Sequence, residues 1–317
     1  MNTDQDTATL QRLIDFLISQ RAVTDKLAIE HAYRSARPLS GTISVGDDCA
    51  AIPDGDGFLL LAAEGMLESF VATDPWFAGY CAVMVNLSDI AAMGGRPLAV
   101  VDVLWTPNLD DSALIWEGIS AASRAYQVPI VGGHTTFSKA DTLHLAAAVL
   151  GKSRKLITSF DALPGDDLLM AVDLRGSYRA DKPFWNASVD APAYRLRHDL
   201  ELLPDLAENS WCRAGKDISN GGVIGTLAML LQCSGAGAEL WLDRIPRPSG
   251  IELDRWLISF PSYGFLLSVG PENTTQVASL FHQHQIACAR VGIIQKGDAL
   301  VLTYGQARKE FPVRIAL

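Results

Sequence analysis

The chain has 317 residues, and its 26 Lys and Arg against 36 Asp and Glu give a formal net charge of −10. Hydrophobic residues make up 49% and charged residues 20%, which is typical of a compact globular chain and excludes a disordered one. The length allows two domains. The acidic balance argues against nucleic acid or an anionic membrane surface as a partner, because both attract basic patches.

Targeting and bilayer-spanning patterns are not found in the sequence. The first ten residues, MNTDQDTATL, are polar and acidic, and no apolar run approaches the roughly 20 residues that span a bilayer. The five cysteines are scattered and contain no CxxC pair, so we expect reduced thiols and no structural zinc. We therefore expect a cytoplasmic protein.

The first third of the chain predicts helices followed by a strand and a long helix. Apolar residues at helical spacing indicate two helices within residues 8–36. The stretch FLLLAAEG, residues 58–65, predicts a buried strand that follows a GDGF turn. Asp74 and Pro75 predict the start of a helix with an apolar stripe, and the glycines at 94–95 predict its end.

The next segment alternates strands and helices. PLAVVDVLWTP (97–107) predicts a strand and LDDSALIWEGISAASRAYQ (109–127) a helix. VPIVGGHT (128–135) predicts a short strand that ends in a glycine turn, and TLHLAAAVLGK (142–152) predicts another strand. This alternation favours an α/β or α+β layered architecture.

A polar, turn-rich segment at 151–166 predicts a domain boundary. We therefore predict an N-terminal domain of residues 1–154 and a C-terminal domain of residues 155–317. The second half shows a further strand and helix series, and residues 287–305 predict a terminal hairpin.

Several acidic residues stand beside glycines or at the ends of apolar elements, where α/β proteins build ligand sites. They are Asp47, Asp48, Glu64, Asp89 and Asp217. A set of carboxylates without a matching set of Lys or Arg suggests a divalent cation, and Mg²⁺ prefers one or two carboxylates plus phosphate oxygens. The pattern therefore predicts a site for Mg²⁺ and phosphate, with ATP as the candidate ligand.

Each of these residues also has a structural explanation when it is taken alone. Asp47 and Asp48 could form a turn, Asp89 could accept hydrogen bonds from a loop, and Asp217 could cap a helix that begins near Val223. The glycines of GGHT could let a phosphate approach the backbone or only make a turn. Neither a P-loop nor a strand–GxGxxG–helix pattern occurs in the sequence.

Taken in order, the motifs GDDCAAI, NLSDIAAMGGRP, GGHTT, LPGDDLLMAV and KDISNGGVIGTL resemble the superfamily of aminoimidazole ribonucleotide (AIR) synthetase, thiamine-monophosphate kinase and selenophosphate synthetase. The resemblance extends from about residue 40 onward, and the first half is most similar to the kinase. It implies an AIR synthetase-like fold with an α/β N-terminal domain, whose sheet pairs with that of a second subunit into a shared barrel, and an α/β C-terminal domain for acceptor specificity. It also implies a homodimer with ATP and Mg²⁺ at the interface.

The resemblance implies roles for individual residues. Asp48, Asp89 and Asp217 match family metal ligands, and Glu64 stands where the kinases have a metal-binding aspartate. The nucleotide would lie against the residues of the glycine turn and of the loop after Asp217, which are Gly132, Gly133, His134, Ser219 and Asn220.

The chain departs from the kinase motifs at several of these positions. His134 and Asn220 stand where the kinases have aspartates, and Ala62 and Ala63 replace hydroxyl-bearing residues. A neutral imidazole is a poor ligand for Mg²⁺. These changes remove ligands from the phosphate site and argue against thiamine phosphate as the substrate.

Two functions follow from these observations. The first is an enzyme that uses ATP and Mg²⁺ to phosphorylate a small molecule, or to activate an amide or carboxylate oxygen. In it, Arg175, Arg179 and Lys182 are candidate contacts for an anionic acceptor, and an exposed, solvated loop is the alternative explanation. The second is a nucleotide-binding regulatory protein without turnover, which the substitutions at His134 and Asn220 favour.

Overall fold

The computed structural model describes residues 3–34, 44–137 and 143–313, without the side chains of residues 30–34. The chain folds into two compact units. The larger unit contains Met1–Asp47, Ile157–Val189 and Asn209–Leu317, and the smaller unit contains Asp48–Leu156 and Asp190–Glu208. None of the helices in the described residues is long and apolar enough to cross a membrane.

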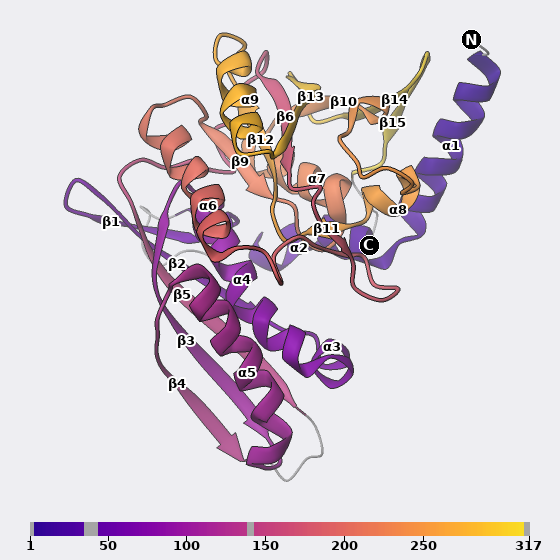
Figure 1. Ribbon diagram of the computed structural model, residues 1–317. Helices are drawn as coiled ribbons and strands as arrows, with labels where there is room; N and C mark the ends of the chain where they lie inside the picture. Colours follow the sequence, from indigo (N-terminus) through magenta and orange to yellow (C-terminus); the bar gives the residue numbers. More distant parts are fainter. Residues whose placement is uncertain (1–2, 35–43, 138–142, 314–317) are drawn as a thin grey trace. The chain divides into compact units, whose positions relative to one another are not determined.

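The smaller unit is built on a five-stranded sheet with the order β1-β2-β5-β3-β4 (Figure 1). Its strands are β1 (Ala50–Asp54), β2 (Gly57–Gly65), β3 (Arg96–Thr106), β4 (Ile130–Phe137) and β5 (His144–Ser153). The hairpin β1–β2, the pair β2–β5 and the pair β3–β5 are antiparallel, whereas β4 is parallel to β3. Strand β4 is an edge strand, with β3 as its one neighbour in the sheet.

Helices cover one face of this sheet. They are α3 (Glu68–Thr73), α4 (Pro75–Ala92) and α5 (Leu109–Tyr126), and α6 (Ala193–Glu208) packs on α4 and α5. The predicted start of α4 is confirmed, because Pro75 is its first residue and the Asp74 side chain accepts a hydrogen bond from the Phe77 amide. Its predicted end is confirmed as well, since Gly94 adopts a left-handed conformation with φ of 73° just after the helix.

The two faces of the five-stranded sheet differ in burial. On β3, Val100 and Leu104 are fully buried on the inner face, where α4 and α5 pack. The opposite face, which we call the outer face, carries apolar side chains that are 39–47% exposed: Leu61, Val101, Trp105 and Leu150. The predicted strand at 58–65 is therefore confirmed as β2, but it is buried on one face only. Leu60 and Ala62 are buried, whereas Leu61 and Ala63 are exposed.

The larger unit contains a seven-stranded sheet with the order β15-β14-β10-β13-β6-β12-β9 and a small sheet with the order β11-β8-β7. The strands are β6 (Asp167–Val172), β7 (Ser177–Tyr178), β8 (Phe184–Asn186), β9 (Ala214–Asp217), β10 (Gly237–Trp241), β11 (Phe260–Pro261), β12 (Gly264–Val269), β13 (Ala287–Gln295), β14 (Leu300–Tyr304) and β15 (Ala307–Phe311). Strands β6 and β12 are buried along their whole length.

The predicted terminal hairpin at 287–305 is wrong in its pairing. Strand β10 lies between β13 and β14, antiparallel to the first and parallel to the second. The hairpin that forms is β14–β15, closed by Gly305 with φ of 56°. The turn predicted at residues 296–299 therefore connects β13 to β14, which are separated in the sheet by β10.

The helices of the larger unit come from both ends of the chain. They are α1 (Thr3–Ser19), α2 (Arg21–Arg34), α7 (Gly222–Ser234), the 3-10 turn η1 (Leu242–Arg244), α8 (Leu253–Leu257) and α9 (Thr274–Gln283). The apolar stripe of α1, including Leu10, Leu13 and Leu17, joins the core formed by residues of the C-terminal half. The two helices predicted within 8–36 are confirmed up to Arg34, and Ala36 lies outside the described residues. Because α1 packs against β14 and β15 and α2 packs against α7, they belong to the larger unit and not to the smaller one, although both lie within the predicted domain 1–154.

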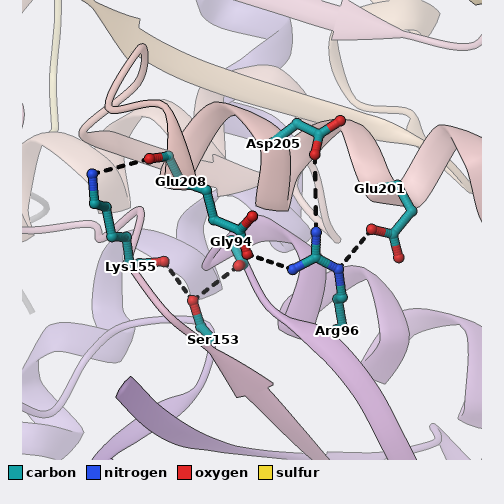
Figure 2. A network of polar contacts seen from close by, with 7 residues as sticks. All are labelled: Gly94, Arg96, Ser153, Lys155, Glu201, Asp205 and Glu208. Carbon is teal, nitrogen blue, oxygen red and sulfur yellow. Dashed lines mark hydrogen bonds and ion pairs between the residues drawn. The ribbon is translucent and has the colours of Figure 1, made fainter. Parts of the chain in front are cut away.

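Helix α6 is held in the smaller unit by a polar network around Arg96 (Figure 2). The Arg96 guanidinium donates to Glu201 at 2.7 Å and to Glu208 at 2.6 Å, and lies 3.9 Å from Asp205. Partial burial opposes the charge on Arg96, but the hydrogen bonds to Glu208 and Glu201 raise its pKa above the ordinary value. The Lys155 ammonium donates to the Glu208 carbonyl at 3.0 Å, so the end of α6 is fixed at two points.

Candidate functional site

Two of the predicted metal ligands, Asp48 and Asp89, lie close together in the smaller unit. Asp89 is on α4 and is 6% exposed, and Asp48 is in the irregular segment before β1. The Cys49 amide donates to the Met93 sulfur at 3.1 Å, which attaches this segment to the end of α4. As a result, a carboxylate oxygen of Asp48 lies within 4.8 Å of one of Asp89.

This pair suits a divalent cation. Two negative charges at such a separation repel each other by about 1 kcal/mol in water and by several times more in a partly buried site. Oxygens bound to one Mg²⁺ lie about 3–4 Å apart, so a small side-chain rotation would bring both carboxylates into one coordination shell. The residues present therefore fit Mg²⁺, with the remaining positions available to phosphate oxygens and water.

Asp47 is bound to Ser159, which belongs to the same larger unit. Its two carboxylate oxygens accept hydrogen bonds from the Ser159 amide at 2.8 Å and from the Ser159 hydroxyl at 2.6 Å. The same serine is tied further by its carbonyl, which accepts from the Ser234 hydroxyl at 2.7 Å. Asp47 thus fixes the point at which the chain enters the Asp48 segment.

Asp217 is the last residue of β9 in the larger unit and is 8% exposed. The chain then turns sharply into α7, because Gly221 and Gly222 have φ of 94° and 61°. The Ser219 amide donates to the Thr226 hydroxyl at 3.3 Å, and the Gly222 amide donates to the Ser219 carbonyl at 2.9 Å. The strand-to-helix turn therefore carries three predicted site residues, Asp217, Ser219 and Asn220, on one short loop.

The predicted glycine turn at 132–135 is wrong, because β4 continues through it as a strand to Phe137. Gly133 pairs with Asp102 of β3, and a β-carbon at Gly133 would lie 2.3 Å from the Asp102 Oδ1 atom and 2.7 Å from its carbonyl oxygen. A β-carbon at Gly132, by contrast, would have no atom within 4 Å. Glycine is therefore needed at Gly133 for close packing and not for a turn.

Glu64 and the β4 residues lie on different strands of the sheet. The pairing registers place Glu64, Ala147, Asp102 and Gly133 in one row across β2, β5, β3 and β4. Three strand spacings separate Glu64 from Gly133, or about 14 Å. Within one chain these two positions therefore do not share an ion.

His134 lies on exposed strand β4 beside Val103 in the register. Side chains alternate along a strand, so His134 points to the side opposite Asp102, toward the outer face. The imidazole is therefore placed with the exposed apolar residues of that face.

Two ionisable residues with notable surroundings in the structure are not among the site residues predicted from the sequence. Asp102 is 2% exposed in the middle of β3, and Arg96 collects three carboxylates from α6. The signal for Asp102 was available, because an aspartate interrupts the apolar run PLAVVDVLW. No local pattern indicates the partners of Arg96, which are 105 and 112 residues away.

Comparison with known families finds two adjacent matches. Residues 46–153 match the N-terminal domain of AIR synthase related proteins, and residues 179–305 match the C-terminal domain of the same proteins. Among curated sequences, the chain is 51% identical over 271 residues to a Synechocystis protein named uncharacterized protein sll0787, covering 85% of this chain and 84% of that protein.

Solved structures with the same fold are more distant in sequence. T. maritima PurL complexed with ATP is 20% identical with a TM-score of 0.75, covering 89% of this chain and 48% of that chain. AaThiL complexed with AMPPCP and TMP is 18% identical with a TM-score of 0.68, covering 89% of this chain and 94% of that one. These likenesses establish an AIR synthetase-like fold of mixed helices and sheets.

Proposed function

We propose, since the chain belongs to the AIR synthase related protein family, that it is an enzyme that uses ATP and Mg²⁺ to transfer a phosphoryl group to a small molecule. The observation that carries the proposal is the approach of the Asp48 and Asp89 carboxylates to within 4.8 Å. The names of two proteins with this fold, a PurL bound to ATP and a ThiL bound to AMPPCP, support a nucleotide as the ligand.

In this proposal Asp48, Asp89 and Asp217 hold Mg²⁺. Asp217 suits the role because it ends a buried strand at a glycine turn, where a carboxylate is held in a fixed direction. Asp47 would orient Asp48 through its hydrogen bonds to Ser159, and Glu64 would bind a further ion or a water of the metal shell.

The nucleotide would contact exposed backbone and short side chains. Gly132, Gly133 and His134 lie on the exposed edge strand β4, and Ser219 and Asn220 lie in the turn just before α7. Backbone amides at a helix start and glycines without side chains both allow close approach of phosphate oxygens.

Chemistry at such a site consists mainly of positioning and charge neutralisation. A bound Mg²⁺ would neutralise charge on the phosphates, while the carboxylates of the chain fix its position. The phosphoryl group would pass either to an oxygen of the final product or to an amide or carboxylate oxygen. In the second case a nitrogen then attacks the carbon that bears this oxygen, and the oxygen leaves with the phosphate. Residues of the larger unit, including Arg175 beside Asp173, would select the acceptor.

We also propose that the chain forms a homodimer through the outer face. Leu61, Val101, Trp105 and Leu150 are exposed together on one side of the five-stranded sheet. Contiguous apolar surface of this kind marks interaction sites, and a second copy of the sheet would bury it in the shared barrel that the family resemblance implies.

A nucleotide-binding protein without turnover is the alternative. His134 replaces an acidic ligand of the related kinases, and its exposed position on β4 gives it no role in holding Mg²⁺. Asn220, at the start of α7, removes a second negative charge. In this case the dimer would respond to the nucleotide and act on another enzyme.

Calorimetric titration with AMPPCP tests the metal and nucleotide parts of the proposal. We expect binding that needs Mg²⁺ and that weakens at least about tenfold in Asp89→Asn, because one of two close ligands loses its charge. Asp56→Asn, in the exposed β1–β2 turn, is the matched control and should bind like the wild type. Equal binding by Asp89→Asn and the wild type, with both folded by circular dichroism, would remove Asp89 from the metal site.

Product analysis separates the two functions. The enzyme should release ADP from ATP when it is supplied with one member of a panel of amides, carboxylates and alcohols. If AMPPCP binds with Mg²⁺ but no acceptor stimulates ADP formation, the regulatory alternative is favoured.

A further inference from the structure

The inner face of β3 carries a buried acid that the proposed function does not use. Asp102 is 2% exposed and lies between Val100 and Leu104, both fully buried. Neither of its carboxylate oxygens has a hydrogen-bond partner among the residues that the structure describes. A buried carboxylate in this position is costly if it is charged, because nothing replaces the water that it has lost.

The residue that pairs with Asp102 on β5 is contacted by a second buried polar side chain, Asn86. Asp102 pairs with Ala147 of β5, whose carbonyl accepts a hydrogen bond from the Asn86 amide nitrogen at 3.3 Å. Asn86 also donates to the Ala82 carbonyl at 2.8 Å, which fixes the orientation of its side chain. Its Oδ1 atom is buried and, within the described part of the chain, has no partner. A protonated carboxyl at Asp102 carries a donor hydrogen, whereas the ionised form can only accept.

Positive charge is not provided by the elements packed around Asp102. The titratable side chains at buried positions of α4 and α5 are Tyr80, Cys81, Asp89 and Tyr126. On the sheet, Glu64 lies in the same row two strands away, and the inward residues of β4 and β5 beside Asp102 are Gly133 and Ala147. Arg96 is on the same strand but about 20 Å away along it. The described groups that face Asp102 are therefore neutral or acidic.

We infer that Asp102 is held as the neutral acid in the folded protein and that its ionisation loosens strand β4. This inference does not depend on the proposed function. It rests on the burial of both oxygens, on the lack of a hydrogen-bond partner for either of them among the described residues and on the tight contact with Gly133.

Strand β4 is the element that gives way because it is the edge strand that pairs with β3 beside Asp102. It has a single neighbour, and none of its residues is buried. The Asp102 carboxylate lies against Gly133, where a β-carbon would be only 2.3 Å from Oδ1. Hydration of a charged Asp102 requires water to enter next to this glycine, and separating the edge strand is the shortest way in.

Burial raises the pKa of the Asp102 carboxyl above the ordinary value for aspartate. In a pH range above about 3.9 the folded protein therefore retains a proton that the unfolded chain releases. The stability that depends on this proton is complete below that pH and is lost as the pH rises through the pKa of the folded state.

Thermal unfolding of Asp102→Asn against the wild type tests the inference. The amide is neutral at every pH and has the shape of the protonated acid. The melting temperature of the variant minus that of the wild type should increase between about pH 3.5 and about pH 8, by roughly 3 °C for each unit by which the pKa is raised. Asp56→Asn, in the exposed turn of the same unit, should follow the wild type. A difference that stays constant with pH would overturn the inference.

Hydrogen exchange of the wild-type protein decides the matter if the variant does not fold. After correction for intrinsic exchange rates, protection of peptides from 130–137 should fall with rising pH, while that of peptides from 75–92 is unchanged. Equal pH dependence in β4 and α4 would show that ionisation does not act on the edge strand.

Discussion

Strand β3 carries two ionisable residues with opposite surroundings. At its start, Arg96 is 39% exposed and lies among three carboxylates of α6 (Figure 2). In its middle, Asp102 is 2% exposed and has no hydrogen-bond partner among the described residues. At the surface, opposite charges from distant segments fasten a helix to a sheet, whereas in the interior a lone acid is tolerated best without its charge.

The difference shows how the two positions contribute to the fold. The Arg96 network acts through charge, so it should respond to salt and to removal of its partners. The Asp102 position acts through close packing against Gly133 and through a proton, so it should respond to added volume and to pH. The following variants test this contrast.

Gly133→Ala should cause the largest loss of stability. The new methyl group would overlap the Asp102 carboxyl and, at 2.7 Å, its backbone carbonyl, which cannot rotate away. We expect a loss of about 2 kcal/mol in the free energy of unfolding, measured with urea. Gly132→Ala is the matched control, because its methyl group would meet no atom within 4 Å. Equal losses in the two variants would mean that β4 is not tightly packed against Asp102.

Arg96→Met should have a smaller effect, about 1–2 kcal/mol, because partly exposed ion pairs are screened by water. The loss should be greater at low salt, where the three unpaired acids repel each other. Arg21→Met is the control, since Arg21 is 92% exposed and pairs with Asp25 in one helix turn, so it should lose under about 0.5 kcal/mol. A salt-independent loss in Arg96→Met would indicate that the side chain acts by packing of its methylene groups.

The sequence predicts elements whose signals are local. Helix α4 begins at Pro75 and is followed by Gly94 as predicted, because its cap and its stop depend on residues within one turn of each end. Asp48 stands beside a glycine turn and Asp89 near the end of an apolar helix, which predicts a shared ligand site, and the structure brings their carboxylates together. Their role as metal ligands stays a prediction.

Features that depend on distant partners could not be predicted in this way. Two adjacent glycines indicate a turn locally, but β4 is extended because it pairs with β3 and because Asp102 occupies the space beside Gly133. The pairing of β10 between β13 and β14, and the packing of α1 on C-terminal strands, likewise join residues far apart in the chain. Pattern and propensity specify which faces are apolar, but not which apolar faces meet.

The acids of α6 should contribute unequally to the Arg96 network, and this is the smallest effect that we expect to be measurable. Glu208 and Glu201 accept hydrogen bonds at 2.6 Å and 2.7 Å, whereas Asp205 lies 3.9 Å away. Double-mutant cycles with Arg96→Met isolate each coupling from the other contacts of the acid. We expect about 0.5–1 kcal/mol for Glu208→Gln and Glu201→Gln, and close to zero for Asp205→Asn. A coupling of Asp205 as large as that of Glu208 would mean that the three acids act as a diffuse negative field and not through directed hydrogen bonds, and the contrast between the two positions on β3 would then lie in burial alone.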